Sequence, residues 1–244
     1  IINFAAESHV DNSIINPSLF TETNILGVHS ILQIANEFWM NGPFKVKSKF
    51  SHSRFHQIST DEVYGSIEFG SFSESNKYSP SSPYSASKAA ADMLISGFHK
   101  TYGLDTTISI CSNNYGPNQN LEKFIPKILS SIKKSFEIPI YGTGNNIRDW
   151  IYVEDHCEAI DLIFNKSKAG LTYNIASKNE LTNLDVVEII NSLISNNSKA
   201  KVKFIEDRYG HDFRYSVNID KIKSELAWVP KTNFEEGIKK LLDS

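Results

Sequence analysis

The chain has 244 residues, which is enough for one large α/β domain or for one domain with a smaller lobe. Its net charge of −3 at pH 7 argues against nucleic acid or an anionic membrane surface as a partner. No apolar run approaches the roughly 18 residues that a membrane-spanning helix needs. A hydrophobic content of 40% and a charged content of 22% are typical of a soluble globular protein.

The two cysteines, Cys111 and Cys157, lie far apart in the sequence and lack the close spacing of a metal site. We therefore expect both to be buried free thiols in a reducing, cytoplasmic environment.

The first half of the chain alternates apolar strand patterns with helix patterns. Residues 1–6 have the character of a buried strand, and we expect that the sequence begins partway into a fold. Further strands are predicted over 54–59 and 106–112, and helices over 17–40 and 82–102. This order predicts parallel strand pairing through right-handed crossovers. Polar loops are expected at 7–11, 41–54 and 66–83.

Shorter elements follow residue 116. A helix is predicted near 124–133, a strand over 138–141, a short strand over 151–153 and a helix over 154–165. Short alternating elements are then expected at 172–175, 183–194, 201–205, 220–227 and 234–242. We interpret the later pieces as a smaller lobe that closes over the carboxyl edge of the sheet.

The chemistry of the chain centres on residues 59–65, which follow the second predicted strand directly. Asp61 and Glu62 lie there side by side. Adjacent acids on a protein surface usually mean only solvation, but the carboxyl ends of strands are where α/β sheets bind ligands. Two neighbouring carboxyls in a closed pocket tend to separate their pKa values, so that one stays protonated while the other acts as a base. Water elimination needs such a pair.

A second motif, Tyr84-x-x-x-Lys88, lies in the predicted helix 82–102. Residues four apart share one helix face, so the ammonium lies near the phenol and favours its ionised form. This would lower the pKa of Tyr84 toward the range of a useful base, with the Thr60 hydroxyl on the same substrate oxygen. The alternative is a surface tyrosine beside a surface lysine, since the chain has ten tyrosines.

Together these residues resemble the extended short-chain dehydrogenase/reductase superfamily, and within it the nucleotide-glucose 4,6-dehydratases, above all those that act on dTDP-glucose. The resemblance implies an N-terminally truncated, Rossmann-type parallel sheet that binds NAD, with a smaller C-terminal α/β lobe for the substrate. It assigns residues 1–113 and 149–170 to the NAD-binding domain, and 114–148 and 171–244 to the sugar-nucleotide lobe. Related epimerases and decarboxylases keep the Tyr and Lys but lack the Asp-Glu pair.

The same resemblance implies which residues bind the cofactor and the nucleotide sugar. The catalytic set is Thr60, Asp61, Glu62, Tyr84 and Lys88. The residues expected to contact NAD are Ala5, Ala6, Ser8, Thr23, Ser59, Tyr84, Lys88 and Asn114. Those expected to contact the substrate are Ser8, Thr60, Asp61, Glu62, Asn113, Lys123, Phe124, Pro139, Ile140, Tyr141, Arg148, Asn183, Asp207, Arg208 and His211.

Some of these assignments also have a direct physical reason. The guanidinium groups of Arg148 and Arg208 are planar forks suited to a diphosphate, although each would also serve in a surface salt bridge. Tyr141 is suited to covering a base ring, and ordinary core packing explains it nearly as well. The pair His52-x-x-x-His56 has ligand-like spacing, but no carboxylate or cysteine completes it, so we expect no metal site.

The mechanism implied by the resemblance starts when Tyr84 removes the proton of the sugar 4-hydroxyl while hydride passes to NAD. Glu62 then removes the proton at C5, Asp61 protonates the departing 6-hydroxyl, and hydride returns to C6. The implied enzyme is an NAD-dependent hydro-lyase of deoxysugar biosynthesis, most often a homodimer that pairs helices such as 17–40 and 82–102.

The glycine-rich turn of dinucleotide-binding folds is missing from the sequence. We expect the 244 residues alone to bind NAD poorly. Four alternatives stay open, namely a UDP-glucose 4,6-dehydratase, a sugar-nucleotide epimerase, a decarboxylase and an inactive fragment.

Overall fold

The computed structural model describes residues 1–194, 199 and 201–243. Its main sheet is built from β1 (Ile2–Asn3), β2 (Phe55–Thr60), β3 (Thr106–Cys111) and β7 (Thr172–Ile175) in the order β1-β2-β3-β7. Every neighbouring pair in this sheet is parallel. The central strands β2 and β3 are buried on both faces, as expected for a parallel sheet covered by helices. The predicted α/β class is therefore confirmed.

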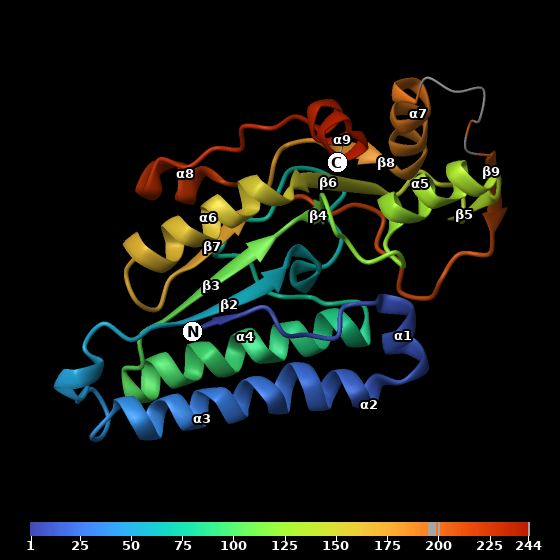
Figure 1. Cartoon of the computed structure of the whole chain (residues 1–244). Helices are drawn as coiled ribbons and strands as arrows, with labels where there is room; N and C mark the ends of the chain where they lie inside the picture. Colours follow the sequence, from blue (N-terminus) through green and yellow to red (C-terminus); the bar gives the residue numbers. More distant parts are fainter. Residues whose placement is uncertain (195–198, 200, 244) are drawn as a thin grey trace.

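Helices cover both faces of this sheet (Figure 1). On one face lie α3 (Gly27–Trp39) and α4 (Pro83–Tyr102), and on the other lie α6 (Val153–Lys166) and α8 (Asp220–Leu226). The larger apolar core lies between these layers and contains Leu32, Phe55 and Ile110, each at 0% exposure.

The helix predicted over 17–40 consists of α2 (Pro17–Phe20), the π-helical segment η1 (Thr21–Leu26) and α3. Two expectations near the start are wrong. The strand expected over 1–6 is only β1, because the chain pairs with β2 through two residues and then leaves the sheet. The segment expected as a loop at 7–11 leads at Val10 into α1 (Val10–Ile15), where Ser13 Oγ donates to the Val10 carbonyl at 2.6 Å.

Strong local signals set the ends of α4. Ser82 is its N-cap and forms a reciprocal capping box with Ser85, and Pro83 occupies the first turn. Gly103 ends the helix with φ 73°, a left-handed conformation that glycine adopts easily. The face turned toward the sheet buries Tyr84 and Lys88.

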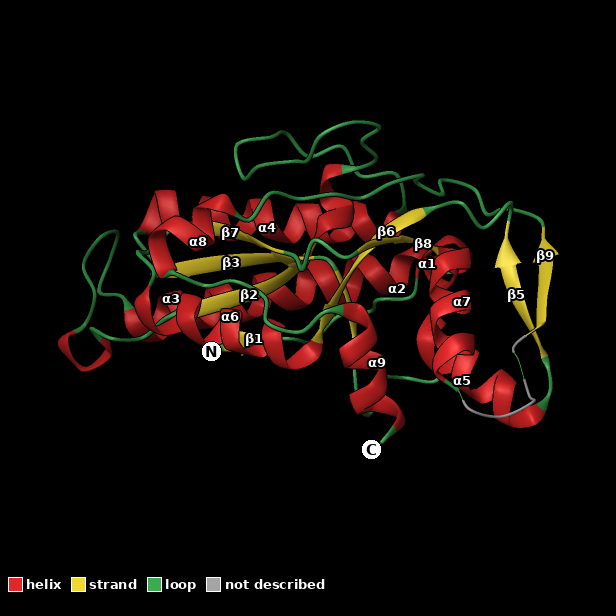
Figure 2. Cartoon of the chain, turned by 90° about the horizontal axis from the view of Figure 1, so that it is seen from above, coloured by secondary structure: helices red, strands yellow, loops and turns green. Residues whose placement is uncertain are grey.

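A smaller group of strands and helices lies beside the main sheet (Figure 2), and it encloses a second apolar core. It packs around Trp150, Ile125, Val186 and Ile238. Its strands are β4 (Asn113–Tyr115), β6 (Ile147–Tyr152) and β8 (Glu180–Thr182) in the order β4-β6-β8, and the parallel pair β5 (Glu137–Tyr141) and β9 (Lys201–Ile205). Its helices are α5 (Phe124–Lys134), α7 (Asn183–Leu193) and α9 (Phe234–Leu242).

The structure differs from the predicted division of the chain at several points. Strand β7 pairs with β3 in the main sheet, although its residues were assigned to the smaller lobe. Its register of four residue pairs with β3 buries Tyr173, Asn174 and Ile175 there. Ile222 of α8 and Trp228 likewise belong to the larger core. Residues 195–198, 200 and 244 of the predicted lobe lie outside the described residues.

Cys111 is buried, but Cys157 is exposed, because it lies on a side of α6 that faces away from the core. The expectation of two buried thiols is therefore wrong for Cys157. Across the described ranges, no helix combines the length and apolarity needed to cross a membrane. Short 3₁₀ turns complete the fold at η2 (Ser48–Phe50) and η3 (Asp61–Tyr64).

Candidate active site

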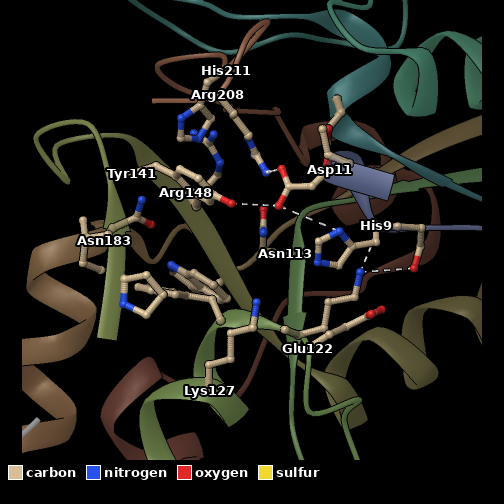
Figure 3. A pocket seen from close by; sticks show the side chains of 18 residues that line it. His9, Asp11, Asn113, Glu122, Lys127, Tyr141, Arg148, Asn183, Arg208 and His211 are labelled. Carbon is tan, nitrogen blue, oxygen red and sulfur yellow. Dashed lines mark hydrogen bonds and ion pairs between the residues drawn. The ribbon is translucent and has the colours of Figure 1, made fainter. Parts of the chain in front are cut away.

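Two adjoining cavities lie at the carboxyl ends of the main strands. The sheet-edge cavity, of about 300 Å³, is lined by residues that include Thr60, Tyr84 and Lys88. The arginine cavity, of about 220 Å³, is lined by residues that include Arg148 and Arg208 (Figure 3). The residues common to both linings are Ser8, Glu62, Asn113 and Lys123. The two cavities therefore form one continuous site, with Glu62 at their junction.

The backbone after β2 delivers the adjacent acids to this site. Thr60 ends the strand, and its Oγ1 accepts a hydrogen bond from the Glu62 N–H at 3.3 Å, which starts the 3₁₀ turn η3. Gly65 then leaves with φ 81°, and a Cβ there would lie 2.4 Å from the Ser79 carbonyl oxygen. Only glycine fits this close approach, so the turn that presents the acids depends on it.

The environments of the two carboxyls differ. Asp61 is 3% exposed, and its Oδ2 has no hydrogen-bond partner in the described part of the chain. Burial raises the pKa of Asp61 well above its usual value, and the charge of Glu62 raises it further. Burial also raises the pKa of Glu62, but the charges of Arg148 and Arg208 oppose that rise. Asp61 is thus suited to hold a proton and Glu62 to accept one.

Tyr84 and Lys88 lie on the same face of α4 and both line the sheet-edge cavity. Burial raises the pKa of Tyr84 well above its usual value, and the charge of Glu62 adds to this, while a hydrogen bond with the Thr60 side chain lowers it. Lys88 Nζ donates to the Ile58 carbonyl at 2.7 Å. Burial therefore outweighs the lowering of the Tyr84 pKa that was expected from the ammonium.

Most of the residues predicted to contact NAD line the sheet-edge cavity. They are Ala6, Ser8, Ser59, Tyr84, Lys88 and Asn114. Ala5 and Thr23 are absent from both linings. The neighbour of Thr23, Asn24, is held by hydrogen bonds. Its side-chain amide bonds to the backbone N–H and C=O of Glu7 and to the Ser87 hydroxyl.

A few other residues of the sheet-edge lining were missed by the sequence analysis. They include Phe4, Cys111 and Gln119. The signal for Cys111 was its place at the carboxyl end of β3, whereas Gln119 reaches the site only because its side chain folds back to the Asn114 carbonyl at 2.8 Å.

In the arginine cavity, three side chains from separate elements meet (Figure 3). The Tyr141 hydroxyl donates to Asp11 Oδ2 at 3.0 Å, and Arg208 NH1 lies 3.4 Å from Asp11 Oδ1. The Arg208 guanidinium also lies 5.6 Å from the centre of the Tyr141 ring. The Nε of Arg208 has no partner in the described ranges, so this cation keeps a free donor.

The sequence predicts that the Arg148 guanidinium is free to bind a diphosphate, but in the structure its donors are bonded to the backbone. It is 5% exposed, and its terminal nitrogens donate to the carbonyls of Ile147, Asp212 and Phe213 at 2.7–3.1 Å. The Tyr215 ring lies 4.1 Å from the guanidinium carbon. The backbone thus fixes this charge at the cavity wall, where it acts on Glu62.

The other predicted substrate residues divide into two groups. Those that line the arginine cavity are Lys123, Phe124, Pro139, Ile140, Tyr141, Asn183 and His211. Asp207 lines neither cavity and accepts a hydrogen bond from His211 Nδ1 at 2.6 Å. Missed lining residues include Asp11, Glu122, Lys127 and Trp150. No spacing in the sequence connects Asp11 with Arg208, which lies 197 residues later.

Histidines, cysteines and acids do not gather into a metal-type cluster of three or more within the described residues. His56 is instead bonded to the hydroxyls of Thr107 and Ser109 inside the sheet.

A protein-family model described as GDP-mannose 4,6 dehydratase matches residues 1–241. The chain belongs to this family. Within it, the dTDP-glucose 4,6-dehydratase of Salmonella typhimurium is 44% identical over 259 residues, and that of Xanthomonas campestris pv. campestris is 42% identical over 252 residues. Each match covers 100% of this chain and 71% of the relative. The family resemblance expected from the sequence is confirmed.

Solved structures of family members agree with the fold. The crystal structure of DesIV, a dTDP-glucose 4,6-dehydratase from Streptomyces venezuelae with NAD bound, matches with a TM-score of 0.90 and 42% identity, covering 100% of this chain and 71% of DesIV. A UDP-glucuronic acid 4-epimerase from Bacillus cereus matches with a TM-score of 0.88 at 22% identity, covering 98% of this chain and 73% of the epimerase, a likeness of fold alone.

Proposed function

We propose that this protein takes part in the dehydration of dTDP-glucose to dTDP-4-keto-6-deoxyglucose, with NAD as its cofactor. The observation that carries the proposal is the meeting of Asp61, Glu62 and Tyr84 around one cavity that continues into an arginine-lined one. The relatives named dTDP-glucose 4,6-dehydratase support this substrate. The adjacent acids favour a dehydratase over an epimerase, because loss of water needs an acid and a base side by side.

The sheet-edge cavity fits the nicotinamide riboside end of NAD. Lys88 has three N–H donors and gives one of them to Ile58, so others remain for ribose hydroxyls. Ser59 donates its hydroxyl proton to Asp92 and keeps lone pairs to accept with. Ala6 adds little bulk where a flat ring would lie. When bound, NAD supplies the acceptor and donor of hydride.

The chain's own residues then supply the proton transfers. Tyr84 acts in its ionised form, which the Lys88 ammonium on the same helix face favours against the effect of burial. It accepts the proton of the sugar 4-hydroxyl, and Thr60 holds the same oxygen. Glu62, at the junction of the cavities, accepts the proton from C5 and returns it to C5 after water has left. Asp61, whose pKa is raised by burial, delivers its proton to the departing 6-hydroxyl, which leaves as water.

The arginine cavity is suited to the nucleoside diphosphate. Arg208 offers a cation with a free donor, and the fixed Arg148 adds a second positive charge. Tyr141 presents a ring for stacking against the base.

Mass spectrometry of products tests the proposal. The protein is first shown by isothermal titration calorimetry to be saturated with NAD, and is then incubated with equal amounts of dTDP-glucose and UDP-glucose. Tyr84→Phe serves as the matched inactive variant. Loss of one water from dTDP-glucose is the expected result. Loss of water only from UDP-glucose would show that the substrate carries uridine instead of thymidine. A stereochemical change without loss of mass would show that the activity is that of an epimerase. Absence of any reaction would contradict the proposal.

We also propose a homodimer that forms through the surface of α2, α3 and α4, which lie side by side in Figure 1. This surface leaves large apolar side chains exposed, including Leu19, Ile34, Phe38 and Met93. Light scattering on a size-exclusion column would measure the mass, and Phe38→Glu is expected to favour the monomer.

A cytoplasmic setting fits the exposed free thiol of Cys157, since a reducing compartment keeps such thiols unpaired. Imaging of a tagged protein in cells tests this location.

A further inference from the structure

Asp92 lies on α4 one turn beyond Lys88 and two turns beyond Tyr84, on the same buried face. It is 2% exposed. Its Oδ2 accepts hydrogen bonds from Ser59 Oγ at 2.5 Å and from the Tyr78 hydroxyl at 3.3 Å. Its Oδ1 has no hydrogen-bond partner among the residues described. A buried carboxylate this incompletely paired is costly, so a structural role alone accounts for it poorly.

Lys88 and Asp92 contact consecutive residues of β2. Lys88 Nζ donates to the Ile58 carbonyl at 2.7 Å, and Asp92 accepts from the Ser59 side chain. Both contacts lie directly before Thr60, where the strand ends at the acids. The helix that carries Tyr84 is thus joined to the strand that carries Thr60 by one backbone contact and one carboxylate contact.

The contact with Ser59 also sets the direction of a hydrogen bond in the sheet-edge cavity. A serine has one O–H to donate. Because Ser59 gives that proton to Asp92, its oxygen can only accept from a molecule in the cavity that it lines.

The charge of Asp92 acts on Lys88. Burial lowers the pKa of Lys88, and the first group that opposes this is Asp92, followed by Cys111. Burial raises the pKa of Asp92 to about 6, while the Ser59 hydrogen bond, the charge of Lys88 and the Tyr78 hydrogen bond hold it down. The groups that face Asp92 are Ser59 on β2, Tyr78 in the loop before α4 and Lys88 on its own helix, and its charge also acts on Tyr64 of η3. At neutral pH the carboxylate is mostly ionised.

We propose that Asp92 is a positioning residue for the Tyr84–Lys88 pair, with its buried carboxylate serving as the counter-ion that keeps the Lys88 ammonium charged and ties α4 to the end of β2. The role in catalysis rests on the proposed function, but the charge of Lys88 can be measured without NAD, substrate or turnover. A failure of this inference is therefore distinguishable from a failure of the proposed function.

The test is an NMR titration of protein labelled with ¹³C at the lysine ε-carbons. The Lys88 signal is assigned by its absence from Lys88→Arg. Asp92→Asn keeps the shape of the side chain and removes the charge, and Glu235→Gln, on the exposed face of α9, is the matched charge control. We expect the Lys88 midpoint to move to lower pH in Asp92→Asn and to stay unchanged in Glu235→Gln. An unchanged midpoint in folded Asp92→Asn would overturn the proposal.

A second variant decides the question if Asp92→Asn does not fold. In the wild type, protonation of Asp92 should produce a step in the Lys88 signal near pH 6, since its pKa is about 6. Ser59→Ala removes a hydrogen bond that favours the ionised carboxylate, so this step should move to higher pH. A missing step, or a step that Ser59→Ala leaves in place, would refute the counter-ion role.

Discussion

Asp11 accepts a hydrogen bond of 3.0 Å from the Tyr141 hydroxyl, and this contact joins α1 beside the main sheet to β5 in the smaller lobe. The other oxygen of the same carboxylate pairs with Arg208 at 3.4 Å. The tyrosine ring and the guanidinium are therefore held at the cavity wall before a ligand binds. A site ordered in advance loses less conformational freedom on binding.

Replacement of Arg208 should weaken binding of the nucleoside diphosphate. A hydrogen bond to a charged group contributes about 1.5–3 kcal/mol, so Arg208→Met should raise the dissociation constant of dTDP by about 10–100-fold. Arg208→Lys keeps the charge without the planar guanidinium, so it should raise the dissociation constant of dTDP by less than Arg208→Met does. Isothermal titration calorimetry with dTDP measures both. If Arg208 acted only through its pair with Asp11, then Asp11→Asn would give the same loss as Arg208→Met.

Replacement of Glu62 should separate water loss from the oxidation at C4. Glu62→Gln keeps the size of the side chain but removes the base, so water loss should slow by about 10²–10⁴-fold. The first proton transfer belongs to Tyr84 and should survive, so reduced cofactor should accumulate in the variant. Absorbance of the reduced cofactor and product mass are followed together. The control is Glu154→Gln, an exposed acid in the first turn of α6, and equal rates in both variants would contradict the role of Glu62.

The parallel sheet and the place of the site could be predicted because both depend on short-range patterns. The strands β2 and β3 are continuous runs of buried residues, and the caps of α4 are local in sequence. The acids follow β2 directly, and the carboxyl ends of parallel strands meet at one edge.

What the sequence analysis missed depends on contacts between distant residues. Asp11 becomes a site residue only through Arg208 and Tyr141, which lie far along the chain. Arg148 was expected to offer a free fork, but carbonyls of the 212–213 segment take up its donors. Strand β7 was placed in the wrong lobe because a strand of four residues carries no sign of which sheet it joins.

A buried histidine should make the fold sensitive to acid. Burial lowers the pKa of His156 to about 4, and its Nδ1 lies 2.7 Å from Asn114 Oδ1. In the unfolded chain a histidine titrates near 6.5, so between these values the unfolded state binds more protons. The free energy of unfolding should therefore fall as the pH falls from 6.5 to 4, by about 3 kcal/mol for this residue at one pKa unit per 1.36 kcal/mol.

Urea unfolding at pH 7.5 and at pH 4.5 measures this contribution. The raised pKa values of buried acids such as Asp61 act in the opposite direction. The test therefore compares, between variants, the slope of the unfolding free energy against pH. Between pH 7.5 and pH 4.5, His156→Gln should lose less free energy of unfolding than the wild type, whatever its stability at pH 7.5. His52→Gln, at an exposed histidine, should leave the loss unchanged. Equal slopes in the wild type and His156→Gln would show that His156 does not carry the effect.

Two helical glycines should respond to alanine in opposite directions, because their surroundings differ. A Cβ on Gly237 of α9 would lie 2.0 Å from the Tyr115 hydroxyl oxygen, and the Tyr115 ring packs against Phe234. Gly237→Ala should therefore destabilise the fold by about 1–3 kcal/mol through overpacking. A Cβ on Gly97 of α4 would meet nothing within 4 Å, so Gly97→Ala should stabilise the helix by about 0.5–1 kcal/mol. Thermal unfolding followed by circular dichroism measures both, at about 2–4 °C per kcal/mol for a chain of this size. Changes of the same sign would mean that helix propensity, rather than the contact with Tyr115, decides the outcome at Gly237.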